Sequence, residues 1–207
     1  MVFKDKRRLL GEHLTSIDIF EELICPEIKN DLYNFLWIDL YAGEGNLIFP
    51  ILNHLRKEER IDFFKDHIFL SDIQEKMVHK CIKTAKNYGI EENIAKQNIR
   101  LRDNLKNCPI FLKKIKYPVY HITNPPYLYL GYIRKHKETQ KYLSYFDNKN
   151  KGYQDLYQIA MVNDLRTKLA DLIYIIPSNL LFGASVSNKV REDFLKYYFI
   201  KKIIIFE

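Results

Sequence analysis

The chain has 207 residues, enough to bury a full hydrophobic core, and a single domain is the simplest expectation. Apolar residues make up 47% and charged residues 29%, with no apolar run of about 18 residues and no signal-peptide core, so no membrane-spanning or secretory segment is predicted. Three cysteines, odd in number and without metal-ligand spacing, favour a reducing cytoplasm, and the net charge of +7 modestly favours a polyanionic partner.

The first predicted element is a helix that begins near residue 16. Thr15 or Ser16 can cap it, since a hydroxyl oxygen there can accept a free backbone N–H of the first turn. Apolar residues then recur at helical spacing through Ile24. Pro26 predicts the end of this helix, because proline lacks the N–H that would continue it.

A strand that ends in a glycine turn comes next. Residues 35–40 are apolar except for Asp39, and Gly43 and Gly45 follow before a helix expected from Leu47 to about Leu55. A nicotinamide-binding turn would need a third glycine, where this sequence has isoleucine. The turn therefore predicts close approach of a ligand to the backbone, but not a nicotinamide site.

Two further strands end at aspartates. Residues 67–70 lead to Asp72 and Ile73, and residues 97–101 lead to Asp103. An acidic side chain that closes the second strand can bind both hydroxyls of a ribose, although a helix cap is an alternative explanation. Turn chemistry alone can explain Asp103.

The fourth strand, residues 117–123, ends in Asn124-Pro125-Pro126-Tyr127. Two prolines remove two backbone donors and fix φ, so the chain must leave the sheet in a stiff, extended turn. An amide, a carbonyl and an aromatic ring are then held where open α/β sheets bind their ligands. The tetrapeptide should arise by chance in about one chain in a thousand of this length, so we interpret it as a functional site.

The remaining residues continue the alternation of helices and strands. Residues 128–151 mix aromatic and basic side chains, which suits either a surface helix and loop or a cover over a flipped base. A helix from Tyr153 to about Leu169, a strand at 172–176, a helix at 186–198 and a sixth strand at 200–206 are predicted next. This alternation predicts an α/β fold with a doubly wound, mostly parallel sheet.

Asn-Pro-Pro-Tyr is the catalytic signature of the amino-methyltransferases, and together with the glycine turn it makes the chain resemble an adenine-N6 DNA methyltransferase. The resemblance runs from about Leu10 to Glu207 and implies a Rossmann-like class I methyltransferase fold that lacks the last antiparallel strand. Acceptors at Asn124 and Pro125 would hold the two hydrogens of the adenine amine, and a flipped base would stack on Tyr127. The implied catalytic residues are Asn124, Pro125, Pro126 and Tyr127.

The resemblance also implies S-adenosylmethionine as the cofactor. Thr15 stands where the family has a threonine that contacts the methionine carboxylate, but His13 and Ser16 replace the usual aromatic residue and proline. Asp39 would receive the ammonium group. The glycines would let the backbone approach the methionine part of the cofactor.

At the other end of the cofactor, Asp72 would bind the ribose, Ile73 would pack on the adenine ring and Asp103 would take the adenine amine. Asn104 is polar where the family commonly has phenylalanine. The implied cofactor-binding residues are Thr15, Asp39, Tyr41, Gly43, Gly45, Asp72, Ile73 and Asp103.

The family also implies a setting for the chain. Residues 1–207 would be the catalytic domain of a restriction–modification enzyme that acts on a flipped adenine in double-stranded DNA. A target-recognition domain is absent from this chain and is expected in a downstream segment or a second subunit. The chain alone is then expected to bind cofactor but to methylate DNA poorly.

Three alternatives remain open. The same tetrapeptide serves enzymes that methylate a glutamine amide in a protein or a guanine amine in ribosomal RNA. The element around Thr15 and the stretch Asp155-Leu156-Tyr157 favour DNA. A non-catalytic DNA-binding subunit is the third, and the intact glycines and tetrapeptide argue against it.

Overall fold

The structure is a computed structural model that describes residues 15–107 and 109–205. The described residues form two compact units. The sheet unit comprises residues 15–107, 109–124 and 169–174, and the helical unit comprises residues 125–168 and 175–205. The predicted family element at His13 lies outside the described residues.

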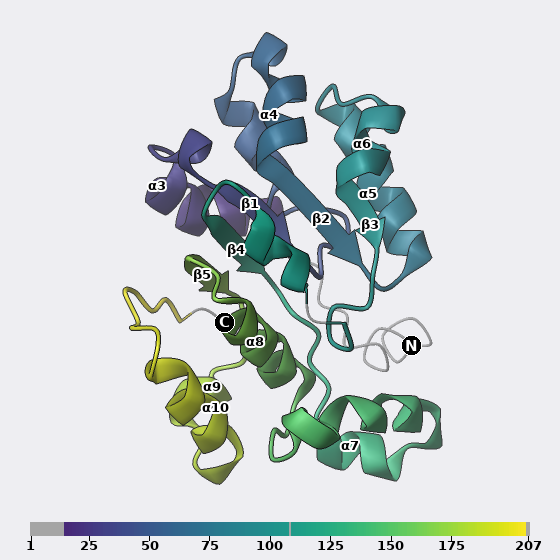
Figure 1. The fold of residues 1–207 in the computed structure, drawn as a ribbon, viewed down its shortest axis with the longest axis vertical. Coiled ribbons are helices and arrows are strands. Elements are labelled where there is room, and N and C mark those ends of the chain that lie inside the picture. The colour runs from purple at the N-terminus through teal and green to yellow at the C-terminus, as the bar shows by residue number, and fades with distance from the viewer. Residues whose placement is uncertain (1–14, 108, 206–207) are drawn as a thin grey trace. The chain divides into compact units, whose positions relative to one another are not determined.

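The sheet unit is built on a five-stranded parallel sheet in the order β3-β2-β1-β4-β5 (Figure 1). In register, Trp37 of β1 lies between Ile68 of β2 and Tyr120 of β4. This arrangement confirms the predicted α/β fold with a parallel sheet. The strands are β1 Leu36–Asp39, β2 Ile68–Asp72, β3 Ile99–Leu101, β4 Val119–Thr123 and β5 Asp171–Tyr174.

The central strand β1 is buried along its whole length, as its apolar sequence predicts. Its Trp37 ring stacks on Tyr120 with 4.9 Å between centroids, and the indole N–H donates to the Leu32 carbonyl at 2.7 Å. Leu36 and Ile38 pack with Val119 in one cluster of the core. The strand that carries Asp39 is therefore fixed by packing from both sides.

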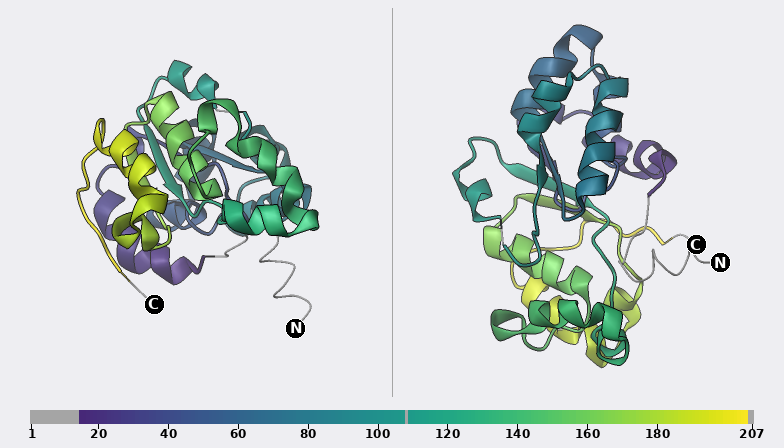
Figure 2. Two further views of the ribbon diagram at one scale, coloured as in Figure 1. Left: turned by 90° about the horizontal axis from the view of Figure 1, so that it is seen from below. Right: turned by 90° about the vertical axis from the view of Figure 1, so that its right-hand side faces the viewer.

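Helices cover the sheet within this unit. Helices α4, α5 and α6 lie together against β2, and α5 and α6 also contact β3 (Figures 1 and 2). The helical segments of the sheet unit are α2 Ile17–Ile19, a π-helical turn Phe20–Ile24, α3 Cys25–Ile28, α4 Arg60–His67, α5 Glu75–Asn87, α6 Glu92–Asn98, and the 3-10 turns Leu32–Asn34, Phe49–His54, Lys57–Glu59 and Ile110–Lys114.

Two predictions about helices need correction. The first helix does not end at Pro26, because the π-helical turn before it widens the backbone and the chain continues helically to Ile28. The segment after the glycine turn is a 3-10 helix at Phe49–His54, with Pro50 in its first turn. Ser16, by contrast, caps α2 as predicted and accepts the Asp18 N–H.

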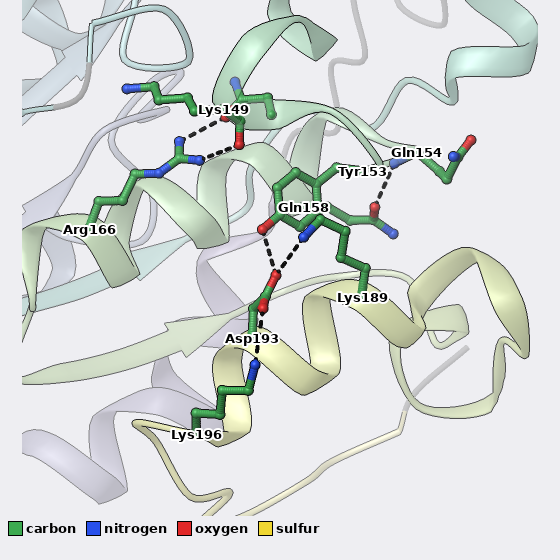
Figure 3. A network of polar contacts seen from close by, with 9 residues as sticks. Lys149, Tyr153, Gln154, Gln158, Arg166, Lys189, Asp193 and Lys196 are labelled. Carbon is green, nitrogen blue, oxygen red and sulfur yellow. Dashed lines mark hydrogen bonds and ion pairs between the residues drawn. The ribbon is translucent and has the colours of Figure 1, made fainter.

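The helical unit is organised around α8, Leu156–Thr167, which is buried over most of its length. A polar network joins α10 to the residues before α8 (Figure 3). Tyr153 donates to Asp193 at 2.8 Å, and Lys189 pairs with the same carboxylate at 3.0 Å. The other segments of this unit are α7 Leu130–Lys135, α9 Asn179–Phe182, α10 Ser185–Leu195, and the 3-10 segments Lys137–Phe146 and Asn148–Asn150.

The predicted sixth strand is not present. Residues 199–205 form no strand, Phe199 is 85% exposed and Ile205 is 64% exposed, while Phe206 lies outside the described residues. The apolar run gives these residues β propensity, but a strand exists only where a neighbour pairs with it. In the part of the chain that the structure describes, no helix has the length and apolar character needed to cross a bilayer.

Candidate active site

The strand order reverses direction at β1. From β1 the chain adds β2 and β3 on one side and β4 and β5 on the other. The carboxyl ends of β1 and β4 therefore lie side by side at the switch point, where open α/β sheets bind ligands. Thr123, the last residue of β4, bridges this point by donating its hydroxyl to Asp39 at 2.6 Å.

Asp39 is a buried carboxylate that holds the turn after β1. It is 2% exposed and accepts the Tyr41 N–H at 2.9 Å in addition to the Thr123 hydroxyl. Burial raises its pKa to about 6, against the opposing effects of His121 and these hydrogen bonds. The Tyr41 ring, which is partly exposed, lies 6.3 Å from the His121 ring.

The glycine turn has a backbone conformation that favours glycine. Gly43 and Gly45 have φ values of 55° and 86°, which side chains rarely tolerate. A Cβ on Gly45 would overlap the Phe49 ring. Asp72 joins this turn to the end of β2, because its carboxylate accepts N–H groups from Gly43 at 3.0 Å and Gln74 at 2.8 Å.

The N-cap position of helix α5 is Gln74 and not Asp72, and Asp72 accepts the N–H of Gln74 directly before the helix. The neighbouring Ile73 is 50% exposed, which leaves an apolar face beside the carboxylate. Asp103 follows β3 and is partly exposed; its carboxylate accepts the Lys106 N–H at 3.0 Å, as in an ordinary turn.

Thr15 and Asn124 are in direct contact. The Asn124 side-chain N–H donates to the Thr15 hydroxyl at 2.9 Å, and Asn46 donates to the Thr15 carbonyl at 2.9 Å. Thr15 thus connects the residue after β4 with the glycine turn. An amide whose nitrogen donates to a hydroxyl has a defined orientation, which also sets where its oxygen points.

Two buried polar residues of this edge were not predicted. Asn104, 2% exposed, donates to the Leu40 carbonyl at 2.8 Å and to the Ser71 hydroxyl at 2.9 Å, so it ties the ends of β1 and β2 together. His121 is fully buried in β4, and its Nε2 accepts the Leu40 N–H at 3.2 Å. The only sequence signal for either is a polar side chain in or directly after an apolar strand.

The remaining three residues of the tetrapeptide belong to the helical unit. The Tyr127 hydroxyl donates to the Ile175 carbonyl, and its ring meets Tyr157 edge to face at 6.2 Å. Burial raises the pKa of Tyr127, so the hydroxyl stays protonated. Asp155 caps α8 and accepts the Leu128 N–H at 2.9 Å, which anchors the chain directly after the tetrapeptide.

The stretch Asp155-Leu156-Tyr157 therefore supports the proline turn from within the same unit. Asp155 holds its backbone and Tyr157 holds the ring of Tyr127. Burial raises the pKa of Asp155 to about 6, although backbone N–H groups at Leu128, Tyr157 and Leu156 favour its charged form.

Comparison with known proteins shows a shared fold. No protein-family model matches the chain, and no curated protein matches it in sequence. Among solved structures, the DrdV–DNA complex aligns with 94% of this chain at 16% identity and a TM-score of 0.66, and the aligned part is 23% of that chain.

Two further structures are similar. A modification subunit of a putative type I restriction enzyme from Vibrio vulnificus YJ016 aligns with 94% of this chain at 15% identity and a TM-score of 0.58. A nuclease-deletion mutant of the type ISP restriction–modification enzyme LlaGI, in complex with a DNA substrate mimic, aligns with 89% at 10% identity and 0.56. The chain spans 41% and 19% of their lengths. It thus has the α/β fold found in restriction–modification proteins.

Proposed function

We propose that the chain is the catalytic domain of an adenine-N6 DNA methyltransferase that uses S-adenosylmethionine and belongs to a restriction–modification system. The observation that carries this proposal is the place of Asn124-Pro125-Pro126-Tyr127. The tetrapeptide starts at the carboxyl end of β4, beside the glycine turn of β1, at the switch point of the sheet. The fold shared with restriction–modification proteins supports the same function.

The residues at this edge fit the proposed cofactor. Gly43 and Gly45, which adopt positive φ values, leave the backbone of the turn uncovered by side chains. Ile73 offers an exposed apolar face next to Asp72. The cofactor would supply an electrophilic methyl group. The residues proposed to hold it are Thr15, Asp39, Tyr41, Gly43, Gly45, Asp72, Ile73 and Asp103.

Asp39 would contribute charge to this site. Its raised pKa shows that its carboxylate is costly to ionise where it is buried, and a cationic ammonium group nearby would favour the ionised form. Asp72 accepts two backbone N–H groups at the carboxyl end of β2, and its carboxylate would bind a ribose hydroxyl there.

Asn124 and Pro125 would act on the target amine. An exocyclic aromatic amine is a poor nucleophile, because its lone pair is delocalised into the ring. Acceptors at the two amine hydrogens draw the nitrogen toward a tetrahedral form and free that lone pair for attack. The Thr15 hydroxyl accepts the side-chain N–H of Asn124 and so orients the amide, whose oxygen would be the acceptor for the amine in this scheme.

Tyr127 would hold the flipped base. The hydrogen bond to Ile175 and the edge contact with Tyr157 fix the plane of its ring, so one ring face can stack on a base without first losing rotational freedom. Because burial keeps its hydroxyl neutral, the ring brings no charge to the aromatic surface of the base.

The variant Asn124→Ala tests this proposal. It should lower methyl transfer to DNA by at least about a hundredfold, the scale seen when a transition-state hydrogen-bonding group is lost. Affinity for S-adenosylmethionine, measured by calorimetry, should stay within about threefold, because the asparagine oxygen faces the target amine in this scheme. Near-normal turnover by Asn124→Ala would contradict the proposed mechanism.

A further inference from the structure

We propose that Glu21, Cys25 and His54 bind a zinc-type divalent transition-metal ion. This site is separate from the proposed methyl-transfer function and does not depend on it. Cys25 Sγ lies 3.3 Å from His54 Nε2, and Glu21 Oε2 lies 3.3 Å from the same nitrogen. The three ligand atoms all lie within 4.8 Å of one another.

These separations match those of ligands around a tetrahedral ion. Zinc bonds of about 2.3 Å to sulfur and about 2.0–2.1 Å to nitrogen and oxygen place S and N about 3.5 Å apart, and N and O about 3.3 Å apart. The Cys25–His54 and Glu21–His54 distances agree with these values. The Glu21 side chain is 41% exposed, so it can move the short distance needed to bring its carboxylate oxygen to a matching distance from Cys25 Sγ.

Hydrogen bonds within the cluster cannot involve all three side chains at once. Both the Cys25 thiol and the Glu21 carboxylate approach the same ring nitrogen of His54. That nitrogen either accepts a hydrogen or carries one, so it can serve the thiol or the carboxylate but not both. A cation among the three would contact all of them. The S, N and O ligand set suits zinc and excludes calcium and magnesium, which prefer oxygen.

The local backbone brings these ligands to one place. Glu21 and Cys25 lie one turn apart on the same helical segment. In its π-helical turn, the Cys25 N–H donates to the Phe20 carbonyl. His54 ends the 3-10 helix after the glycine turn. The Cys25 thiol is buried, whereas the His54 side chain is 34% exposed. An ion could therefore enter from solvent and keep water as its fourth ligand.

The ion would connect two segments of the sheet unit. The helix with Glu21 and Cys25 starts directly after Thr15, and the 3-10 helix with His54 follows Gly43 and Gly45. One bound ion would therefore link these two segments of the sheet unit, which is a structural role.

Cobalt titration of the full chain tests the site. The protein is first dialysed against a chelator and then titrated with Co²⁺, whose thiolate charge-transfer and tetrahedral d–d bands report sulfur ligation and geometry. We expect one saturable site with both bands, displaced by Zn²⁺. Cys25→Ser should abolish the charge-transfer band, and His54→Gln should weaken binding at least about tenfold.

A matched control is His79→Gln, which changes an exposed histidine of α5 outside the cluster and should leave the spectrum unchanged. If Cys25→Ser fails to fold, His54→Gln gives the same readout from a partly exposed position. The proposal is overturned if no saturable tetrahedral spectrum appears. It is also overturned if the thiolate band persists in Cys25→Ser, or if the band is lost in His79→Gln but kept in the cluster variants.

Discussion

At the scale of residues, one hydrogen bond connects the two ends of the proposed site. Thr15 and Asn124 are 109 positions apart in sequence, yet the Asn124 amide donates to the Thr15 hydroxyl at 2.9 Å. In the proposed mechanism this bond decides which end of the amide faces the substrate. Thr15 would then act on the reaction through Asn124 as well as on the cofactor.

Thr15→Val keeps the shape of the side chain and removes the hydroxyl acceptor. We expect kcat for methyl transfer to fall about fivefold to tenfold, which corresponds to the loss of one ordinary hydrogen bond. Thr15→Ser restores an acceptor and should recover most of the rate. Steady-state kinetics on both variants measure this. Equal losses in both variants would show that packing, and not the hydroxyl, is what matters.

At the scale of elements, the glycine turn and the α8 cap each give a prediction. The turn after β1 needs glycine at position 45 for two reasons, a positive φ and the Phe49 ring beside it. Gly89, after α5, also has a positive φ of 87° but has open space around it. The two positions therefore separate backbone strain from steric overlap.

Gly89→Ala should lower the free energy of unfolding by about 1–2 kcal/mol, from the left-handed backbone alone. Gly45→Ala should lower it by about 1–3 kcal/mol more, because the new methyl group must displace the Phe49 ring. Denaturant unfolding of both variants measures the difference. Equal losses would mean that Phe49 moves aside without cost.

Asp155 makes stability depend on pH. Its folded pKa of about 6 lies above the unfolded value of 3.8, so the folded state holds the proton more tightly. The resulting stabilisation is complete below about pH 4 and is lost as the pH rises through 6, by up to about 3 kcal/mol.

Asp155→Asn keeps an oxygen that can accept the Leu128 N–H and cap α8, but it has no carboxyl to titrate. The decline in unfolding free energy between pH 4 and 6 should therefore be smaller in this variant than in the parent chain. Asp155→Ala serves as the control, because it loses the cap at every pH. Identical pH profiles for Asp155→Asn and the parent chain would contradict the assignment.

At the scale of the whole molecule, the fold was predictable because its strands are local patterns. The central strands of a parallel sheet are continuous apolar runs, and glycine, aspartate and proline mark their ends, so β1, β2 and β4 could be read directly. The sixth strand was predicted on the same grounds, and that prediction is wrong. An apolar run does not by itself determine whether a neighbouring strand pairs with it.

In the candidate site, too, local sequence patterns could be predicted but contacts between distant segments could not. The turns at glycine and proline could be predicted from the sequence, because these residues restrict or permit particular backbone conformations. The roles of Asn104 and His121 could not, because both hydrogen-bond to Leu40, which is distant in sequence. The contact of Cys25 with His54, 29 positions away, likewise exists only after folding. The division of the chain between catalysis and target recognition stays a prediction.

The measurement that tests the central claim most directly identifies the methylated product. The chain is incubated with unmethylated DNA and S-adenosylmethionine bearing a labelled methyl group, and the DNA is digested to nucleosides for mass spectrometry. We predict label in N6-methyl-2′-deoxyadenosine, and none when Asn124→Ala replaces the parent chain. Label found instead on a protein glutamine or an rRNA guanine in parallel reactions, or no loss of label in Asn124→Ala, would contradict the account.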